Sequence, residues 1–380
     1  TGGFVAGGHI KANFGFAQGF QHFEESSVDF GSFFETVPQA LRWISKQPKQ
    51  DPWFAFIHGY DCHRPYAHSG LFWHPFDSDY TGIIDEIIES RNETERIFSG
   101  VYYPKADLRR VWHQNGERML DPTWYAEVGA GQHTALGQGV QLSDKDLEHL
   151  KAHYDSGVLV ADTYLGLLID QLKKTAQWEN LILVVLSDHG EDLQDHGFTN
   201  HRAVLFDSTT RVPLLISGGA VPANLRGQRI DTVVDALDIV PTITTIAETV
   251  APSDAHGRDL WTAMQNNALP QNSASLQQGV LGQLSLRNAT HRLTFSGSSL
   301  QQENLTSVLQ NSEIHSGAYA LYDLHADPME TLNIIDTQKD IAVSMKKQMV
   351  ERLQRLKPAN SVESEVASEL KKALQSRGYW

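Results

Sequence analysis

Residues 181–202 carry a dense group of side chains that could do chemistry. The apolar run Leu181–Leu186 leads directly into Asp188 and His189, and a second Asp-His-Gly follows at residues 195–197. An ionised carboxylate at the end of a buried strand is costly unless a cation or a hydrogen bond neutralises it. A divalent cation bound by Asp188 and His189 would do so. The alternative is that Asp188 caps a following helix, and this stretch alone leaves both interpretations open.

Other candidate ligands follow the ends of two predicted strands. His63 comes three residues after the apolar run 53–60, and His196, His201 and Arg202 follow the Asp-His pair. Scattered surface histidines are the simpler explanation for any one of them, because the chain has 17. Ligands bind beyond the carboxyl ends of strands in open parallel sheets, however, so their convergence on two such ends argues for a site.

The elements that must position these residues can be read from the hydrophobic pattern. Apolar runs at 53–60, 181–188 and 211–219 predict buried strands. A long helix begins at Ser143, with Asp146 completing a capping box, and carries an apolar stripe through Val158 to Leu172. A further helix is predicted at 235–250. Strand, long helix and strand in succession predict an α/β fold in which a mostly parallel sheet is sandwiched by helices.

The pattern changes near residue 275. Short alternating strands with turn residues follow, and then a helix from Ile341 to about Leu356. We therefore predict an α/β domain over residues 1–275 and a small C-terminal subdomain over residues 276–380, built from an antiparallel sheet plus a helix.

Composition narrows the range of partners. The net charge of −15 disfavours nucleic acid and anionic membranes as general partners. The sequence has no run of about 18 apolar residues, the length that would predict a membrane span. The single cysteine, Cys62, excludes an internal disulfide framework and a zinc site built from cysteines.

Taken in order, several segments resemble the sulfatase family of the alkaline phosphatase superfamily. The resemblance rests on GFAQGFQHFEE (15–25), WFAFIHGYDCHRPY (53–66), YDSGVLVADTYLGLLIDQL (154–172), LSDHGEDLQDHG (186–197) with HRAVLFDSTTRVPLLISGG (201–219), DALDIVPTITTIAETV (235–250) with GRDLW (257–261), and ALYDLHADPMETLN (320–333). Their joint order is specific, although no single segment is. The resemblance implies an alkaline phosphatase-like fold.

The resemblance also implies roles for individual residues. Asp188 and His189 would be metal ligands, for Ca²⁺ or Mg²⁺. His63 would contact the sulfate or the leaving oxygen. Arg202 falls where the family often has a sulfate-binding lysine, and His201 is the rival for that role. His9 matches a further substrate-binding histidine, although Gly7 replaces the lysine of that segment.

The implied activity is metal-dependent hydrolysis of sulfuric esters, with a small-molecule or carbohydrate sulfate ester as substrate. A phosphatase, phosphodiesterase or phosphonate hydrolase of the same superfamily is the first alternative, and a non-catalytic scaffold is the second. The family suggests a periplasmic or secreted location, whereas the oligomeric state is left open.

Two family motifs are not found in the sequence. These are an early Asp-Asp pair and C/S-x-P-S-R, whose cysteine or serine becomes the formylglycine nucleophile. Cys62 lacks the required proline and arginine spacing, and we expect a structural role for it. The expectation is therefore of a chain without the N-terminal part of the family, a fragment or one piece of a two-chain protein, that is inactive on its own.

Overall fold

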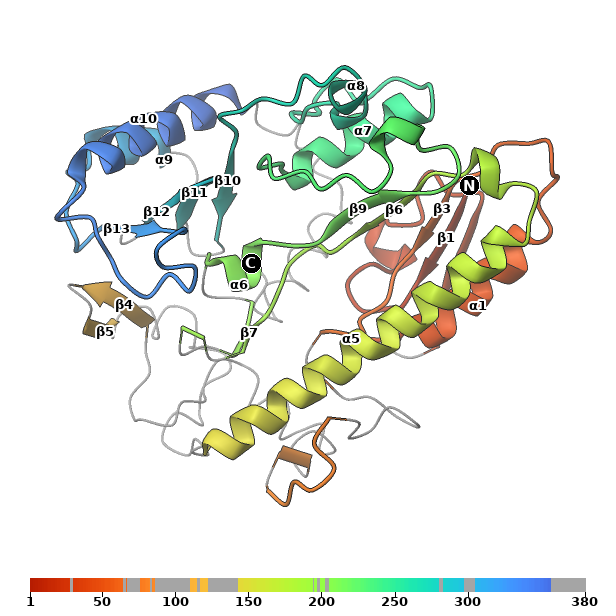
Figure 1. The fold of residues 1–380 in the computed structure, drawn as a ribbon, viewed down its shortest axis with the longest axis horizontal. Helices are drawn as coiled ribbons and strands as arrows, with labels where there is room; N and C mark the ends of the chain where they lie inside the picture. The colour runs from red at the N-terminus through yellow and green to blue at the C-terminus, as the bar shows by residue number, and fades with distance from the viewer. Residues whose placement is uncertain are drawn as a thin grey trace.

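The computed structural model describes residues 1–27, 30–63, 66, 76–82, 84–85, 110–114, 117–121, 143–193, 195–196, 199–201, 205–279, 283–296 and 305–356. Figure 1 shows a parallel sheet with two helices at one end of the molecule and an antiparallel sheet with its own helices at the other. No helix in this described part is both long and apolar enough to cross a membrane.

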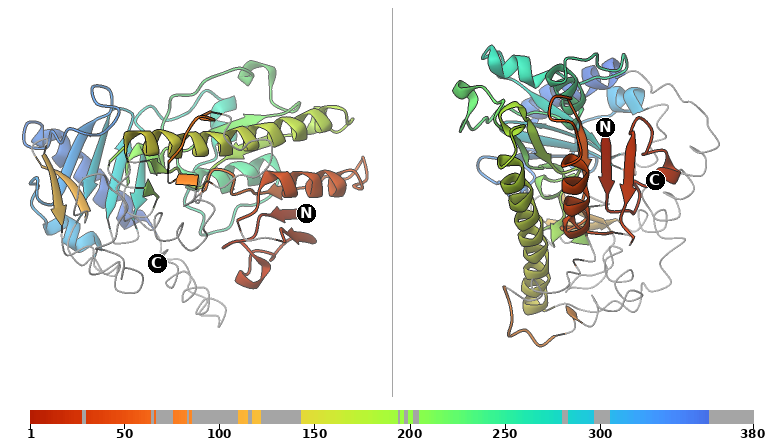
Figure 2. Two further views of the ribbon diagram at one scale, coloured as in Figure 1. Left: turned by 90° about the horizontal axis from the view of Figure 1, so that it is seen from below. Right: turned by 90° about the vertical axis from the view of Figure 1, so that its right-hand side faces the viewer.

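The N-terminal sheet is parallel, with strand order β2-β1-β3. Its strands are β1 (Gly2–Val5), β2 (His22–Glu25) and β3 (Ala55–Ile57), and the 3-10 turn η1 (Ala12–Phe14) connects the first two. Helices α1 (Phe33–Ile44) and α5 (Asp144–Lys173) run side by side along it, as both views of Figure 2 show. Phe4, Val37, Ala40, Ile44, Leu168 and Leu172 form the core between helices and sheet.

Helix α5 begins as predicted, because Ser143 and Asp146 form the expected capping box. Its buried face differs from the predicted stripe. Val158 is 44% exposed, whereas His149 and His153 are buried near the N-terminal end. The first turns of α5 therefore bury polar side chains, which need partners of their own.

The strands after α5 were predicted correctly, but their expected place in a parallel sheet was wrong. Strand β6 (Leu183–Leu186) pairs antiparallel with β9 (Leu214–Ser217). A parallel return needs a crossover of a dozen or more residues, usually a helix. The connection instead holds the two-residue strands β7 (Asp192–Leu193) and β8 (Thr199–Asn200) and the short helix α6 (Asp207–Thr210). Leu186 and Leu215 are 44% and 56% exposed, so this pair is less buried than expected.

The C-terminal sheet is antiparallel, in the order β10-β11-β12-β13, as the sequence predicted. Its strands are β10 (Ala274–Gln278), β11 (Leu284–Asn288), β12 (His291–Phe295) and β13 (Tyr319–Asp323). Helices α9 (Leu305–Asn311) and α10 (Lys339–Arg355) cover it, which confirms the predicted closing helix. The boundary near residue 275 stays a prediction.

The remaining elements are short. The predicted helix at 235–250 is observed as η5 (Ala236–Asp238) and α7 (Ile239–Ile246), followed by α8 (Leu260–Gln265). The others are η3 (Trp178–Asn180), η4 (Ala223–Leu225) and the hairpin β4 (Arg110–Gln114) with β5 (Glu117–Asp121).

A buried ion-pair network joins α6 to the C-terminal sheet. The guanidinium of Arg292, which is fully buried, bonds to the carboxylates of Asp207 and Glu330. Arg287 makes two further bonds to Asp207, of 3.0 and 3.1 Å. Burial acts to raise the pKa of Asp207, but the hydrogen bond from Arg287 and the charge of Arg292 outweigh it and lower the pKa below its usual value. The network therefore holds the ionised carboxylate of Asp207, in α6, against the sheet, whereas burial raises the pKa of Glu330 above its usual value.

We expect the Arg292→Met variant to lose about 3–5 kcal/mol of unfolding free energy, because it leaves two carboxylates buried without their shared cation. Chemical denaturation at neutral pH measures this loss. The control is Arg229→Met, whose exposed pair with Asp231 should contribute no more than about 0.5 kcal/mol. Equal stability of the two variants would show that the network is not a major stabilising contact.

Candidate active site

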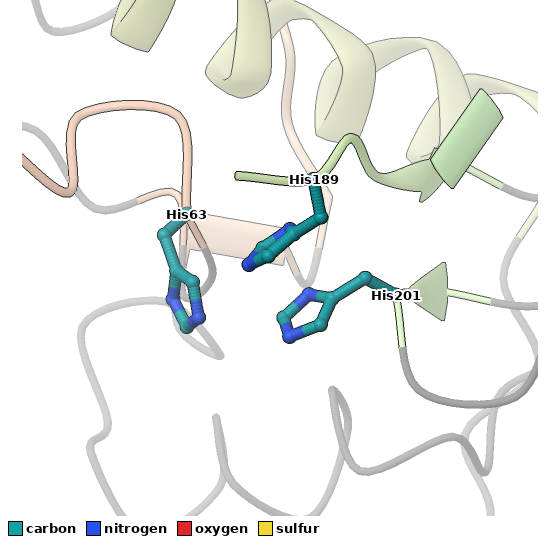
Figure 3. A group of neighbouring side chains, drawn as sticks. All are labelled: His63, His189 and His201. Carbon is teal, nitrogen blue, oxygen red and sulfur yellow. The ribbon is translucent and has the colours of Figure 1, made fainter. Parts of the chain in front are cut away.

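Three histidines from separate segments meet at the ends of the strands. His63 follows β3, His189 follows β6, and His201 follows β8. One ring nitrogen from each lies within 4.8 Å of the others. Figure 3 shows the three imidazoles gathered in one place. The structure thus brings together three of the residues that the sequence singled out.

The rings are in close contact with one another. His189 and His201 are stacked, with ring centroids 3.8 Å apart and planes 24° apart. His63 lies 5.2 Å from His201 and 6.0 Å from His189, centroid to centroid. Phe30 stacks on His63 at 5.4 Å, and Tyr60 meets it edge-on at 5.3 Å. Aromatic packing therefore fixes the orientation of His63.

Hydrogen bonds determine which ring nitrogens of His189 and His201 carry a proton. Nδ1 of His189 lies 3.0 Å from the carbonyl oxygen of Gly190, and Nδ1 of His201 lies 3.0 Å from Oε1 of Glu191. A carbonyl or carboxylate oxygen only accepts, so each Nδ1 carries the proton. In the neutral rings Nε2 is then a lone-pair acceptor, suited to bind a metal ion or a proton.

Asp188 does not cap a helix, so that alternative is wrong. No helix begins in residues 189–193. Its side chain is 73% exposed, Oδ1 accepts a hydrogen bond from the backbone nitrogen of His189, and Oδ2 lies 3.6 Å from Nε2 of that residue. Two acceptors face each other there when His189 is neutral, so the pair suits either a proton or a shared cation.

The donor set around Asp188 fits a divalent cation in part. Ca²⁺ and Mg²⁺ prefer six or more oxygen ligands, and Asp188 supplies at most two of them. Imidazole nitrogens suit metals such as Zn²⁺ better. Asp188 and His189 can therefore serve as part of a metal site, completed by other oxygen ligands when the ion is Ca²⁺ or Mg²⁺.

Gly190 locks the loop that carries His189 onto α6. Its nitrogen donates to the carbonyl oxygen of Thr209 at 2.8 Å. A Cβ atom at this position would lie 2.2 Å from the backbone oxygen of Ser208. Only glycine fits this close approach, and the position of His189 therefore depends on α6.

Glu191 is a site residue that the sequence did not single out. Its side chain is 3% exposed, and it accepts hydrogen bonds from His201 and, at 2.8 Å, from the hydroxyl of Tyr66. A carboxylate behind an imidazole fixes its tautomer and orientation and raises its basicity. Glu191 is thus a positioning residue for His201. Its place directly after Gly190 was the only sequence signal.

His58 is a second residue that the sequence missed. It directly follows β3, and its Nδ1 is buried without a hydrogen-bond partner among the described residues. Burial, chiefly, lowers its pKa to about 4. The charge of Asp188 acts to raise it, and His189 acts to lower it further. His58 is therefore neutral at physiological pH, and its placement one residue beyond the strand was the available signal.

Three other predicted residues lie outside this cluster or outside the described chain. His9 contacts Phe30, at 6.0 Å between ring centroids, and its backbone nitrogen donates to the hydroxyl of Tyr60; both aromatics also contact His63. His196 is buried between Asp192 and the carbonyl of Met329, which indicates a structural role. Arg202 lies outside the described residues.

Gly7, where the family segment has a lysine, has a left-handed backbone with φ of 77°. A side chain there would be strained. This conformation explains the departure from the family pattern at that position.

Cys62 lies close to the site but is poorly suited to act as a nucleophile. Burial, together with the charges of Asp61 and Glu191, raises its pKa to about 12. The reactive form of cysteine is the thiolate. Cys62 is a neutral thiol at physiological pH, in line with the structural role expected from the sequence.

The fold is an α/β fold of the alkaline phosphatase and sulfatase type. The chain belongs to the sulfatase family, because the Sulfatase family model matches residues 16–249. A second model, "N-sulphoglucosamine sulphohydrolase, C-terminal", matches residues 194–359.

Individual relatives are more distant. Arylsulfatase K of Xenopus laevis is 28% identical over 199 residues, which cover 51% of this chain and 35% of that protein. The chain thus spans about a third of the length of the arylsulfatases K that it matches. The structure of BT4656 with its substrate D-glucosamine-2-N,6-O-disulfate matches with a TM-score of 0.54 and 17% identity, over 89% of this chain and 72% of that one. The phosphonate monoester hydrolase of Agrobacterium radiobacter matches with a TM-score of 0.54 and 18% identity, over 87% and 64%.

The low pKa of His58 predicts a pH-dependent stability. The unfolded chain binds a proton near pH 6.5, whereas the folded state binds it only near pH 4. Stability should therefore fall as the pH drops from 6.5 to 4, by roughly 3 kcal/mol at 1.36 kcal/mol per pKa unit. Denaturation curves between pH 7 and pH 4 should show a shallower fall for His58→Phe than for wild type. Replacing the exposed His325 should leave the slope unchanged, and equal slopes in all three proteins would contradict the assignment.

The pairing of Glu191 with His201 predicts a tautomer that can be measured. Ring ¹⁵N NMR of the neutral protein should show His201 protonated on Nδ1, and Glu191→Ala should shift it toward the Nε2-protonated form. Glu148→Ala, on the exposed face of α5, is the control. Unchanged ring shifts in Glu191→Ala would show that another group sets the tautomer.

Proposed function

We propose that this chain provides the metal-binding and anion-binding part of an active site that hydrolyses sulfuric esters. The observation that carries the proposal is the convergence of His63, His189 and His201 beside the exposed carboxylate of Asp188. Such a set can neutralise a tetrahedral oxyanion and deliver a proton to a leaving oxygen. Both are required when a sulfate ester is cleaved.

The hydrogen bonds suggest how the roles divide. Nδ1 of His189 and of His201 is engaged by Gly190 and Glu191, so Nε2 of either ring donates to a sulfate oxygen only when the ring is protonated. A neutral ring instead offers its lone pair to a metal. We assign Asp188 and His189 to the metal, and His63 and His201 to the sulfate and the leaving oxygen. Arg202 is the further candidate for a sulfate contact, and His9 for a more remote one.

A divalent metal, Ca²⁺ or Mg²⁺, would supply Lewis-acid neutralisation of the bound sulfate. Asp188 gives this ion a hard oxygen ligand. His58 is neutral at physiological pH, and the charges of Asp188 and His189 both act on its pKa. It therefore adds no positive charge that would compete with the metal ion.

Sulfated sugars are the substrate class that we propose. BT4656, which shares the fold, was solved with a glucosamine disulfate. Phosphonate monoesters are the second candidate, because a phosphonate monoester hydrolase matches equally well in fold. Both are monoanionic tetrahedral esters, and the imidazole cluster can accommodate either.

The chemical nucleophile is not assigned to any residue of this chain. The sequence has no C/S-x-P-S-R segment, and the Cys62 thiol is protonated. We therefore propose that these 380 residues alone bind the anionic ester but turn it over negligibly.

The test is a titration of the purified chain with inorganic sulfate in the presence of Mg²⁺ or Ca²⁺, followed by calorimetry. We expect His63→Ala and His201→Ala each to weaken sulfate binding at least about 10-fold, or about 1.4 kcal/mol. The exposed His325→Ala should bind like wild type. Equal affinities in all of these proteins would overturn the anion-binding assignment.

Turnover is assayed separately with an aryl sulfate, glucosamine disulfate and a phosphonate monoester. A robust burst of sulfate release from the wild-type chain would refute the proposed inactivity without affecting the binding assignment. Preferential cleavage of the phosphonate would favour the second candidate substrate.

A further inference from the structure

A second cluster of metal-ligand side chains lies at the N-terminal end of α5, apart from the candidate active site. His149 and His153 are one helical turn apart on the same face of α5, and Asp85 approaches them from the preceding segment. Both imidazoles are almost fully buried, at 1% and 3% exposed, and the side chain of Asp85 is 28% exposed. In Figure 1 residues 76–82 and 84–85, in orange, lie beside this half of α5.

The three ligand atoms form a nearly equilateral triangle. Oδ1 of Asp85 lies 3.0 Å from Nε2 of His149 and 3.1 Å from Nε2 of His153, and the two nitrogens are 3.1 Å apart. An ion about 1 Å out of the plane of this triangle would be about 2 Å from all three atoms, the usual Zn–N and Zn–O distance. The two rings are perpendicular, which lets both nitrogens face one point.

An outer carboxylate orients the first histidine. Nδ1 of His149 lies 3.0 Å from Oδ2 of Asp77, so this nitrogen carries a proton and Nε2 of the neutral ring is left as an acceptor. Nε2 then faces Oδ1 of Asp85, a second acceptor. A cation at the centre of the triangle turns this repulsive contact into shared coordination. A carboxylate behind a ligating histidine is the usual second sphere of such sites.

Packing holds His149 in this orientation. The ring of Tyr80 stacks on it, with centroids 3.7 Å apart and planes 9° apart. The Tyr80 hydroxyl bonds to Asp146 of the α5 capping box and accepts from the backbone nitrogen of Ile84. The ligands are thus held by side chains from both segments, as a preorganised site requires.

We propose that Asp85, His149 and His153 bind a divalent ion of the Zn²⁺ class, which fastens residues 84–85 to α5. Two imidazoles and one carboxylate leave a fourth position of a tetrahedral ion for another ligand. Two histidines four residues apart on a helix are a common way to bind zinc. The proposal does not depend on the proposed sulfatase chemistry, because it uses none of the same residues.

A series of side-chain contacts links this site to the candidate active site. Tyr154, next to His153 in the chain, contacts the ring of Tyr66 at 6.0 Å between centroids. Tyr66 in turn donates to Glu191, which orients His201. An ion that fixes this end of α5 would therefore also stabilise the positions of Tyr66 and Glu191 behind His201.

The test uses the full chain, stripped of metal and then equilibrated with Zn²⁺, with bound metal measured by mass spectrometry after gel filtration. The double variant His63→Ala/His201→Ala, which lacks two imidazoles of the candidate active site, should retain one equivalent of zinc. In this background Asp85→Asn and His153→Ala should each abolish zinc binding. Asp77→Asn should keep the stoichiometry but bind at least about 10-fold more weakly, as expected for an outer carboxylate. Asp155→Asn, exposed on the same helix, is the matched control and should behave as wild type.

A second measurement reports the coordination geometry. Co²⁺ bound to the His63→Ala/His201→Ala protein should give the intense visible absorption of tetrahedral coordination, and Zn²⁺ should abolish it. Zn²⁺ should raise the melting temperature of wild type but not of Asp85→Asn. The melting curve of Asp85→Asn also shows whether that variant is folded. Retention of zinc when Asp85→Asn or His153→Ala is added to the His63→Ala/His201→Ala background would overturn the proposal. So would absence of binding together with a doubly protonated His149 in ring NMR, since that would identify the cluster as a buried ion pair with Asp77 and Asp85.

Discussion

The hydrogen-bonding of Glu191 is the interaction on which the candidate active site depends. A carboxylate that is 3% exposed cannot remain ionised at low cost unless its oxygens are bonded. One oxygen accepts from Tyr66 and the other from His201, so a single side chain joins three segments of the chain. Without it, the Nε2 lone pair of His201 would have no fixed direction, and the stacked pair with His189 would lose its order. The chemistry assigned to the imidazoles therefore rests on a residue that need not touch the substrate.

Much of the architecture could be predicted because it is encoded locally. The apolar runs that became β3, β6 and β9 end in polar residues, and the Ser143–Asp146 capping box marks the start of α5. The direction of pairing between β6 and β9 could not be predicted, since it depends on how the connecting chain folds and not on the strands themselves. The predicted apolar stripe of α5 differed from the observed buried face for a related reason. His149 and His153 are buried because Asp77 and Asp85 meet them, and these partners are 72 and 64 residues away from His149.

The candidate site was predictable to a similar degree. His63, Asp188 and His189 follow the ends of predicted strands, where ligand sites form in α/β folds, and His201 was singled out because it closely follows the Asp-His pair. Glu191 and His58 lie next to the same strands but were missed, because their importance comes from partners that only the fold supplies. His9 belongs to a strand end too, and Phe30 and Tyr60 contact both it and His63. Position along a strand thus indicates nearness, whereas the contacts of each side chain depend on the fold.

The packing of Gly190 against α6 has a consequence for how the chain can be divided. His189 rests on α6 through that glycine, α6 is held by Asp207, and Asp207 is held by Arg287 and Arg292, both beyond residue 275. The C-terminal sheet thus supports His189, which lies about a hundred residues earlier in the sequence. A cut at the predicted boundary near residue 275 would remove the contacts of Asp207 that hold α6, against which His189 is positioned.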